Sequence, residues 1–269
     1  MIESLHRRVD ALARLPGLAS LVRRQAYAAF LANRERNLFF GVHSTFDEAA
    51  QAALACGQAG YDNSESARLY THRTRIDAHD YPALYWLSRS LNEGHRSVFD
   101  VGGATGIKFI AFRDLLQSCA DLRWTVQDVP AMVALGREQA RQRDDARLQF
   151  TDRFDDGDGS DLLYASGVLQ YLPATLGELL AGWQRLPRRI VINTAAIHPQ
   201  HEFFTVNSLG TAFCPYRVQT QASLIRGLVA LGYRLREAWT HPGKVMQIPF
   251  HPERSLDQYS GYCLDLNRS

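Results

Sequence analysis

Short apolar segments alternate with stretches of helical periodicity from Ser97 onward, and this alternation constrains the fold more than any other feature. The apolar segments are residues 98–101, 124–126, 148–150, 162–165 and 189–193. Strands that alternate with helices form βαβ units, and the helical crossovers make neighbouring strands parallel. The sequence therefore predicts an α/β fold with a mostly parallel sheet.

The last part of the chain adds one helix and two strands to this prediction. Residues 221–231 have helical periodicity and end before Gly232, a residue type that commonly closes helices. Two further β-rich segments follow at 233–239 and 259–266, joined by a loop with three prolines, Pro242, Pro249 and Pro252. We therefore expect a seven-stranded sheet with helices on both faces.

The first 94 residues carry helical signals instead. Leu5, Val9 and Leu12 recur at helical spacing, and residues 18–36 repeat the pattern. A basic amphipathic start of this kind can lie on a membrane surface. We favour core packing or a homodimer through these N-terminal helices.

Two further helices are expected before the sheet begins. Thr45-Phe46-Asp47-Glu48 forms a capping box, which predicts a helix from Thr45 to Gly57. Residues 81–92 form the second helix, which ends before Gly94. We therefore divide the chain into an N-terminal helical cap or lid (1–94) and a catalytic domain (95–269).

Composition and charge exclude several classes of protein. The formal net charge is only +2 over 269 residues, which gives no basic stripe for nucleic acid. No apolar run approaches the roughly 20 residues that a membrane span requires. The four cysteines form neither a disulfide framework nor a zinc pattern, and no secretory signal is visible. We expect a cytoplasmic protein with a small-molecule substrate.

Arginine pairs are scattered along the chain and interleaved with acidic residues. They are Arg7-Arg8, Arg23-Arg24 and Arg188-Arg189. We expect these pairs on solvated helix faces or at loop ends.

The glycine-rich segment after the first predicted strand is the strongest chemical signal. Asp100 lies in this strand, and Gly102-Gly103-Ala104-Thr105-Gly106 leads into a helix from Ile107. Glycines allow a sharp turn close to a ligand, and the next helix offers free N–H groups to a nucleotide-like molecule. The spacing favours S-adenosylmethionine (SAM) over a dinucleotide, whose motif is G-x-G-x-x-G. A turn without a ligand is the other alternative.

A second carboxylate follows the next predicted strand. Asp128-Val129-Pro130 comes soon after residues 124–126, and the carboxyl ends of adjacent parallel strands line one crevice. A carboxylate there can accept hydrogen bonds from both hydroxyls of a ribose. Alternatively, Asp128 caps a helix that starts at Pro130.

The end of the third predicted strand supplies less specific candidates. Asp152 or Arg153 would lie near an adenine edge, and Phe154 would stack on the ring. Solvation of these side chains in a loop is the alternative.

The fourth predicted strand opens into the region expected for the sulfonium of SAM. Ser166, Gln170 and Tyr171 are the polar or aromatic groups best placed to face it. An aromatic face attracts a cation, which makes Tyr171 a candidate contact. A core tyrosine with a satisfied hydroxyl is the alternative.

In order and spacing, the segments between residues 97 and 195 resemble class I SAM-dependent methyltransferases, which implies a Rossmann-like fold. Asp128-Val129-Pro130 is also similar to the Asp-Leu-Pro step of small-molecule O-methyltransferases, whose aspartate contacts the SAM ribose. Ala104 departs from the family's usual glycine, and a methyl group is tolerable there if the backbone keeps a negative φ. The expected cofactor-binding residues are Asp100, Gly102, Gly103, Gly106, Asp128, Val129, Asp152, Arg153, Phe154, Ser166 and Gly167.

A second set of segments is distributed over nearly the whole chain: 40–42, Phe46, Ala49, 60–62, 166–172, 213–218, 232–233 and 259–261. In these segments the chain resembles a bacterial family of methyltransferases with mostly unassigned substrates, often linked to surface-polysaccharide or secondary-metabolite genes. Enzymes within or near that family cyclise SAM to azetidine-2-carboxylate and release methylthioadenosine. The resemblance implies a SAM cofactor without a metal, and leaves methyl transfer and cyclisation both open.

Methyl transfer to a small-molecule or sugar-type acceptor depends on alignment, and a general base assists an alcohol acceptor. The base candidates follow the fifth strand: His198, His201 and Glu202, with Asn207 and Tyr216 nearby. A metal pair at His198 and His201, and histidines that only stabilise a loop, are alternatives.

Cyclisation needs aromatic faces and hydrogen-bond acceptors around SAM instead of a strong base. The residues suited to it are Tyr171, Asn207, Ser208 and Tyr216, with Tyr61 and Tyr70 in the wall of the pocket. A non-catalytic SAM-fold binding module is the third hypothesis. The expected catalytic residues are Tyr171, Asn207, His201 and Tyr216.

Overall fold

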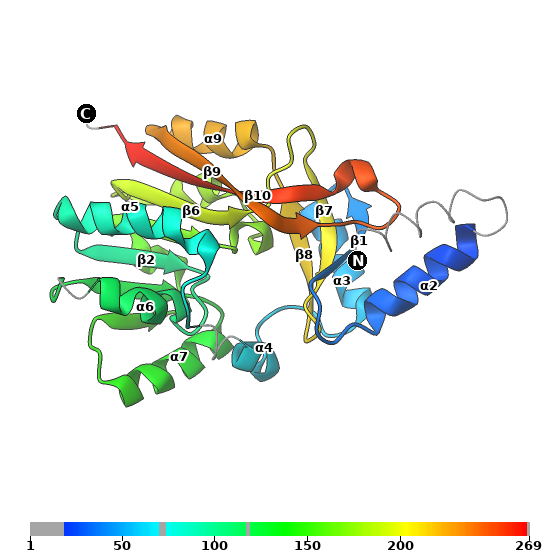
Figure 1. The fold of residues 1–269 in the computed structure, drawn as a ribbon, viewed down its shortest axis with the longest axis horizontal. Coiled ribbons are helices and arrows are strands. Elements are labelled where there is room, and N and C mark those ends of the chain that lie inside the picture. Colours follow the sequence, from blue (N-terminus) through cyan, green and yellow to red (C-terminus); the bar gives the residue numbers. More distant parts are fainter. Residues whose placement is uncertain (1–18, 70–73, 117–118, 268–269) are drawn as a thin grey trace. The chain divides into compact units, whose positions relative to one another are not determined.

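A computed structural model describes residues 19–69, 74–116 and 119–267, which form two compact units (Figure 1). The small unit contains residues 19–60, Ala196–Thr220 and Pro242–Tyr259. The sheet unit contains the described parts of Tyr61–Ala195, Gln221–His241 and Ser260–Ser269. Each unit is therefore assembled from segments that are far apart in the sequence.

A seven-stranded sheet in the order β4-β3-β2-β5-β6-β10-β9 confirms the predicted Rossmann-like fold. The five strands from β4 to β6 are parallel, and β10 is antiparallel to β6. Strands β9 and β10 both continue past the boundary of the sheet unit. The bounds are β2 (Ser97–Val101), β3 (Arg123–Gln127), β4 (Leu148–Thr151), β5 (Leu162–Ser166), β6 (Arg189–Ala195), β9 (Tyr233–Met246) and β10 (Leu256–Leu266).

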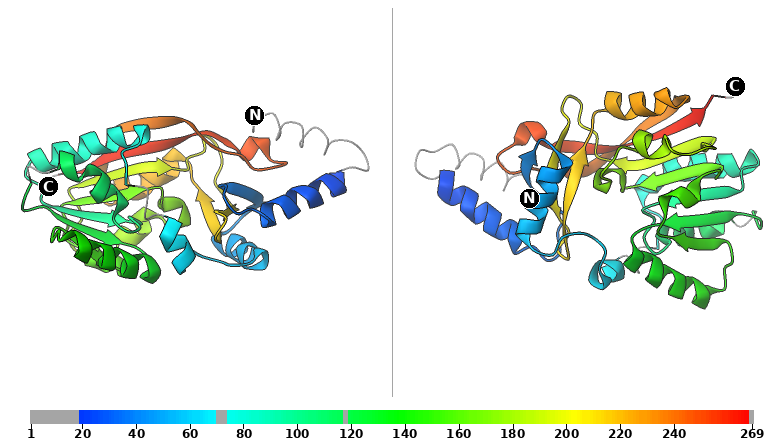
Figure 2. Two further views of the ribbon diagram at one scale, coloured as in Figure 1. Left: turned by 60° about the horizontal axis from the view of Figure 1, so that its bottom comes forward. Right: turned by 180° about the vertical axis from the view of Figure 1, so that it is seen from behind.

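Helices flank this sheet (Figure 2). Leu87 of α5, Phe109 of α6 and Trp124 of β3 belong to one apolar core. Phe99 of β2 points to the opposite face because side chains alternate along a strand, and its ring packs against Trp183, 5.7 Å between centroids. The helices are α4 (Ser64–Leu69), α5 (Tyr81–Asn92), α6 (Ile107–Phe112), α7 (Pro130–Arg143), α8 (Leu176–Leu180) and α9 (Gln221–Ala230).

The small unit holds a three-stranded antiparallel sheet in the order β1-β7-β8. Its apolar core contains Phe30, Ala53, Val206 and Phe213. The bounds are α2 (Ala19–Leu31), β1 (Leu38–His43), α3 (Phe46–Cys56), β7 (Phe203–Ser208) and β8 (Phe213–Val218). Every helix in the described ranges is too short or too polar to span a membrane.

The prediction of a purely helical segment before residue 94 is wrong at β1, and strands β7 and β8 were not predicted. Pro242 lies inside β9 and not in the predicted loop, because β9 continues to Met246. Helix α2 ends at Leu31, before the predicted end at residue 36. The division of the chain at residue 94 stays a prediction. The predictions for Leu5, Val9, Leu12 and Tyr70 fall outside the described residues.

The two helices predicted between Thr45 and Gly94 are confirmed. Helix α5 spans the predicted residues 81–92. Helix α3 begins after Thr45, whose hydroxyl accepts from the Glu48 amide at 3.1 Å. The Glu48 carboxylate accepts from the Ser44 amide at 2.8 Å and not from that of Thr45, so the second capping bond is displaced by one residue.

Gly261 of β10 packs directly against an indole ring. A Cβ at this position would lie 2.2 Å from atoms of Trp239, whose Nε1 donates to Asn193 Oδ1 at 3.2 Å. We expect Gly261→Ala to displace the indole, break this hydrogen bond and lower the free energy of unfolding by about 1–3 kcal/mol. Urea denaturation measures the change. Gly182→Ala is the control, since nothing lies within 4 Å of a Cβ there, and equal losses in both variants would contradict this packing role.

Candidate functional site

The turn between β2 and α6 is closely packed against its own protein surroundings. Gly102 and Ala104 have φ of +66° and +52°, in the left-handed region that favours glycine. A Cβ at Gly102 would lie 2.2 Å from Val168, and one at Gly103 would lie 2.4 Å from the Asp100 carboxylate. The packing of the turn therefore requires these glycines, independently of any close approach to a ligand.

The positive φ of Ala104 shows that the negative φ expected at this position is wrong. A left-handed conformation costs a residue with a Cβ roughly 1–2 kcal/mol. Ala104 packs with Ala67 and Met132 in a small apolar cluster, and its amide donates to Asp128 Oδ2 at 2.7 Å. These contacts offset the backbone strain.

Asp100 is a buried carboxylate beside the turn. It is 1% exposed, and its Oδ2 accepts from Trp124 Nε1 at 3.0 Å. Burial raises the pKa of Asp100 to about 7; the Trp124 hydrogen bond opposes this shift and the charge of Asp128 adds to it. Asp100 therefore organises the turn, and a direct contact with a ligand stays a prediction.

Asp128 lies directly after β3 and accepts two backbone hydrogen bonds. Its Oδ1 accepts from the Val129 amide and its Oδ2 from the Ala104 amide, both at 2.7 Å. Burial raises its pKa to about 6; these two bonds oppose the shift, and the charge of Asp62 adds to it. The alternative that Asp128 caps α7 is wrong, because Val129 is the N-cap residue and Asp62 accepts from the Ala131 amide at 2.8 Å. Asp62 was not predicted as a site residue.

The candidates after β4 lie in two different environments. Asp152 and Arg153 are exposed. Phe154 is half-buried, with its ring centroid 5.9 Å from that of Phe99 and 4.9 Å from that of Trp183. These ring contacts fix Phe154 against the sheet, and its stacking on adenine stays a prediction.

The segment after β5 carries an aromatic pair. Tyr171 ends the short helix η4 (Leu169–Tyr171), and its ring lies edge-on to that of Tyr61, with centroids 5.0 Å apart. Both side chains are half-buried. Ser166 and Gly167 precede this helix, and Gly167 has a φ of +70°. The structure therefore brings together two tyrosines that the sequence predicts for the same pocket.

Two buried polar atoms on the turns after β2 and β5 have no hydrogen-bond partner within the described part of the chain. They are Thr105 Oγ1 and Gln170 Oε1, in residues that are 1% and 5% exposed. The other end of the Gln170 amide donates to the Thr194 carbonyl at 3.5 Å. A buried polar atom left unpaired costs roughly 1–3 kcal/mol. A hydrogen bond from a ligand to either atom would remove this cost.

A buried polar cluster around Asn193 of β6 was not predicted. Asn193 Oδ1 lies 2.8 Å from His241 Nε2 and 3.2 Å from Trp239 Nε1, and its Nδ2 donates to the His79 carbonyl at 3.1 Å. An indole only donates and a carbonyl only accepts, so the orientation of the amide is fixed. In the neutral ring, His241 therefore carries its proton on Nε2. No spacing in the sequence links these residues.

The candidates Asn207 and Tyr216 lie in the small unit. Asn207 Nδ2 donates to Asn37 Oδ1 at 2.6 Å and to the Leu38 carbonyl at 2.9 Å. The hydroxyl of the buried Tyr216 is 2.8 Å from that of Tyr259. These bonds connect strands and loops of the small unit, and a catalytic role for either residue stays a prediction.

The His198 ring stabilises a loop of the small unit, and the role of the His201 side chain stays a prediction. His198 Nδ1 accepts from two backbone amides, with that of His201 at 2.9 Å, and its Nε2 lies 3.1 Å from the Glu253 carbonyl. Burial lowers the pKa of His198. Glu202 accepts from the Thr220 hydroxyl at 2.7 Å. Within the described ranges, no group of three His, Cys, Asp or Glu side chains is placed to hold a metal ion.

Comparisons with known proteins find similar solved structures. No family model matches the chain, and no curated protein matches it. OxaC shares 16% identity over 77% of this chain and 52% of its own, with a TM-score of 0.48. The O-methyltransferase NcsB1 from neocarzinostatin biosynthesis shares 17% identity over 82% of this chain and 68% of its own, with a TM-score of 0.43. Magnesium protoporphyrin IX methyltransferase from Synechocystis PCC 6803 shares 13% identity over 77% of this chain and 97% of its own, with a TM-score of 0.48. This chain therefore spans about half the length of OxaC.

The raised pKa of Asp100 makes the stability of the protein depend on pH. The pKa of Asp100 rises from 3.8 to about 7 on folding. The stabilisation that the protonated group provides is therefore fully present below pH 3.8 and is lost as the pH rises through 7. Relative to Asp100→Asn, we expect wild type to lose roughly 2–3 kcal/mol of unfolding free energy between about pH 5 and pH 8. Urea denaturation across this range tests the point, and parallel profiles for the two proteins would contradict it.

Proposed function

We propose that the sheet unit binds SAM at the carboxyl ends of β2, β3 and β5, and that the protein transfers its methyl group to a small-molecule or sugar-type acceptor. One combination carries the proposal: a glycine turn packed around Asp100, and a second carboxylate, Asp128, at the end of the adjacent strand. In open α/β sheets, ligands bind in the crevice outside these strand ends.

Asp128 is the proposed partner of the ribose hydroxyls. Each of its oxygens accepts one backbone N–H, from Val129 or from Ala104. A carboxylate has about four lone-pair positions, so each oxygen can accept one more hydrogen bond. Two hydroxyl donors would also favour the charged form of Asp128 and oppose the rise of its pKa on burial.

The polar atoms and rings on the neighbouring turns suit the rest of the molecule. Gln170 Oε1 only accepts hydrogen bonds, which matches the ammonium group of SAM, and Thr105 Oγ1 can bind its carboxylate. Tyr61 and Tyr171 offer aromatic faces to a sulfonium cation. Bound SAM supplies an activated methyl group, so the chain's main tasks are alignment of the acceptor and exclusion of water.

Other roles remain predictions. These are His201 as a general base, the N-terminal cap as a lid, a homodimer, a cytoplasmic location and a place in secondary metabolism.

The ribose contact predicts a loss of affinity in one variant. Asp128→Ala should weaken binding of S-adenosylhomocysteine roughly 5- to 150-fold, which corresponds to about 1–3 kcal/mol for hydrogen bonds to a charged group. Isothermal titration calorimetry measures the dissociation constant.

The matched control is Asp257→Ala, because Asp257 is exposed and lies in the small unit. Melting temperatures are measured in parallel, since Asp128 also accepts bonds within the turn. A folded Asp128→Ala protein with wild-type affinity would remove this carboxylate from the ribose site.

Incubation with SAM alone tests the reaction. We expect SAM to stay intact until a cell extract supplies an acceptor, after which S-adenosylhomocysteine accumulates in the mass spectrum. Formation of methylthioadenosine and azetidine-2-carboxylate without an acceptor would show that the protein cyclises SAM and that the proposed methyl transfer is wrong. If neither SAM nor S-adenosylhomocysteine binds, the proposed enzymatic function is wrong.

A further inference from the structure

An arginine-rich cavity of about 960 Å³ lies beside the amino-terminal end of β6 in the sheet unit. Arg189 is the first residue of β6 and pairs in register with Asp265 of β10. Asn193, which pairs with Ser166 at the carboxyl end of β5, is four residues further along β6, or about 13 Å at 3.3 Å per residue. The cavity is therefore separate from the strand ends proposed to bind SAM. Its arginines are Arg89, Arg188, Arg189, Arg234 and Arg236.

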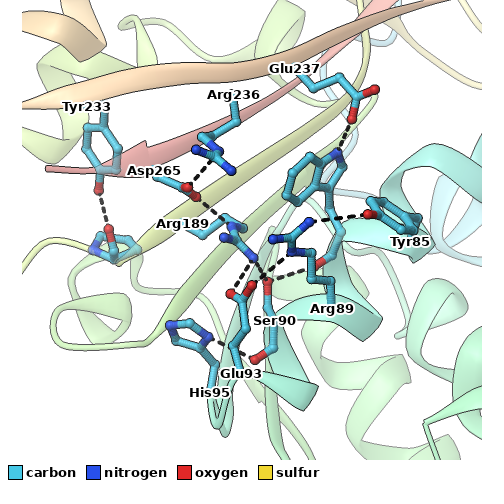
Figure 3. A network of polar contacts seen from close by, with 12 residues as sticks. Tyr85, Arg89, Ser90, Glu93, His95, Arg189, Tyr233, Arg236, Glu237 and Asp265 are labelled. Atoms are coloured by element: carbon cyan, nitrogen blue, oxygen red, sulfur yellow. Dashed lines mark hydrogen bonds and ion pairs between the residues drawn. The ribbon is translucent and has the colours of Figure 1, made fainter.

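Two acids hold three of these arginines in place. Asp265 accepts from Arg189 at 2.6 Å and from Arg236 at 3.1 Å. Glu93 accepts from Arg189 at 3.0 Å and from Arg89 at 2.9 Å. Figure 3 shows Arg189 linked to both carboxylates at the centre of this network. Each acid therefore bridges two guanidinium groups that come from different elements.

The wall of the cavity is anchored in the protein interior. Arg189 is only 6% exposed, so the expectation of a solvated Arg188-Arg189 pair is wrong for this residue. Its guanidinium also donates to Ser90 Oγ at 2.8 Å and lies 5.0 Å from the ring centroid of Trp86. A wall held in this way is organised before a ligand binds, which reduces the entropy lost on binding.

Positive charge exceeds negative charge in this cavity. Five guanidinium groups face two carboxylates, those of Glu93 and Asp265. Among the described residues, Arg188 and Arg234 make no ion pair, and both are exposed. Like charges gathered in one concave surface repel one another and attract anions.

We propose that this cavity binds a small phosphate-bearing anion. The planar fork of arginine donors matches the oxygens of phosphate in a bidentate geometry. A phosphate group brings nearly two negative charges, which suits the excess of guanidinium groups. Arg188 and Arg234 are the residues assigned to the phosphate, and the ion-paired network around Arg189 forms another part of the same cavity wall. The volume also admits a phosphoester of a small metabolite.

Calorimetric titration of the full chain tests the proposal. Inorganic phosphate, glycerol 2-phosphate and pyrophosphate are each titrated at constant ionic strength, with sodium chloride as the blank. We expect saturable binding of at least one of the three, weakened at least tenfold in Arg188→Gln/Arg234→Gln. The matched control is Arg123→Gln/Arg143→Gln, which removes the same charge from β3 and α7 and should bind as wild type does.

The three probes separate the sources of the anion, since preferences for the free ion, the monoester or the diphosphate each give a different order of affinity. Both variants replace exposed side chains, and melting temperatures check that they fold. Absence of saturable heat with wild type would overturn the proposal, as would equal affinity in wild type and Arg188→Gln/Arg234→Gln. SAM is not needed in the titration, so this result does not depend on the proposed methyl transfer.

Discussion

The burial of the Asp100 carboxylate beside the turn after β2 is the constraint on which the candidate site depends. The carboxylate fits there because Gly103 has no side chain and because Trp124 of the adjacent strand donates a hydrogen bond. The same turn presents the Ala104 amide to Asp128. One buried group thereby links two strands and the loop between β2 and α6, and it fixes the position of the second carboxylate. Binding residues held by such contacts keep their geometry without a ligand.

The sheet could be predicted from the sequence where its strands are buried on both faces. Strands β2, β5 and β6 are buried along almost their whole length and are mostly apolar, because parallel strands covered by helices have no solvent face. The small unit could not be predicted in this way. Its strand β8 contains Pro215 and Arg217, and its three segments meet only through tertiary contacts, such as Asn207 with Asn37.

The part of the candidate site that could be predicted consists of residues whose location follows from their position along a strand. Asp100 and Asp128 lie at adjacent strand ends as expected, since register follows from the order of the elements. Asn193 and His241 could not be predicted, because the hydrogen bonds of the Asn193 amide join residues that are far apart in the sequence. The burial of Arg189 could not be predicted either, since its two partner acids come from distant segments of the sequence.

Ala104 has a consequence for how this turn can change over evolutionary time. Glycine at this position would remove the strain of the positive φ, which stabilises the fold by roughly 1–2 kcal/mol. It would also remove the methyl contact with Met132 and Ala67, which destabilises the fold by about 0.8 kcal/mol. The two effects have opposite signs and similar sizes. Drift between alanine and glycine at residue 104 is therefore close to neutral for folding, so an alanine in this glycine-rich motif is no mark of a decayed site.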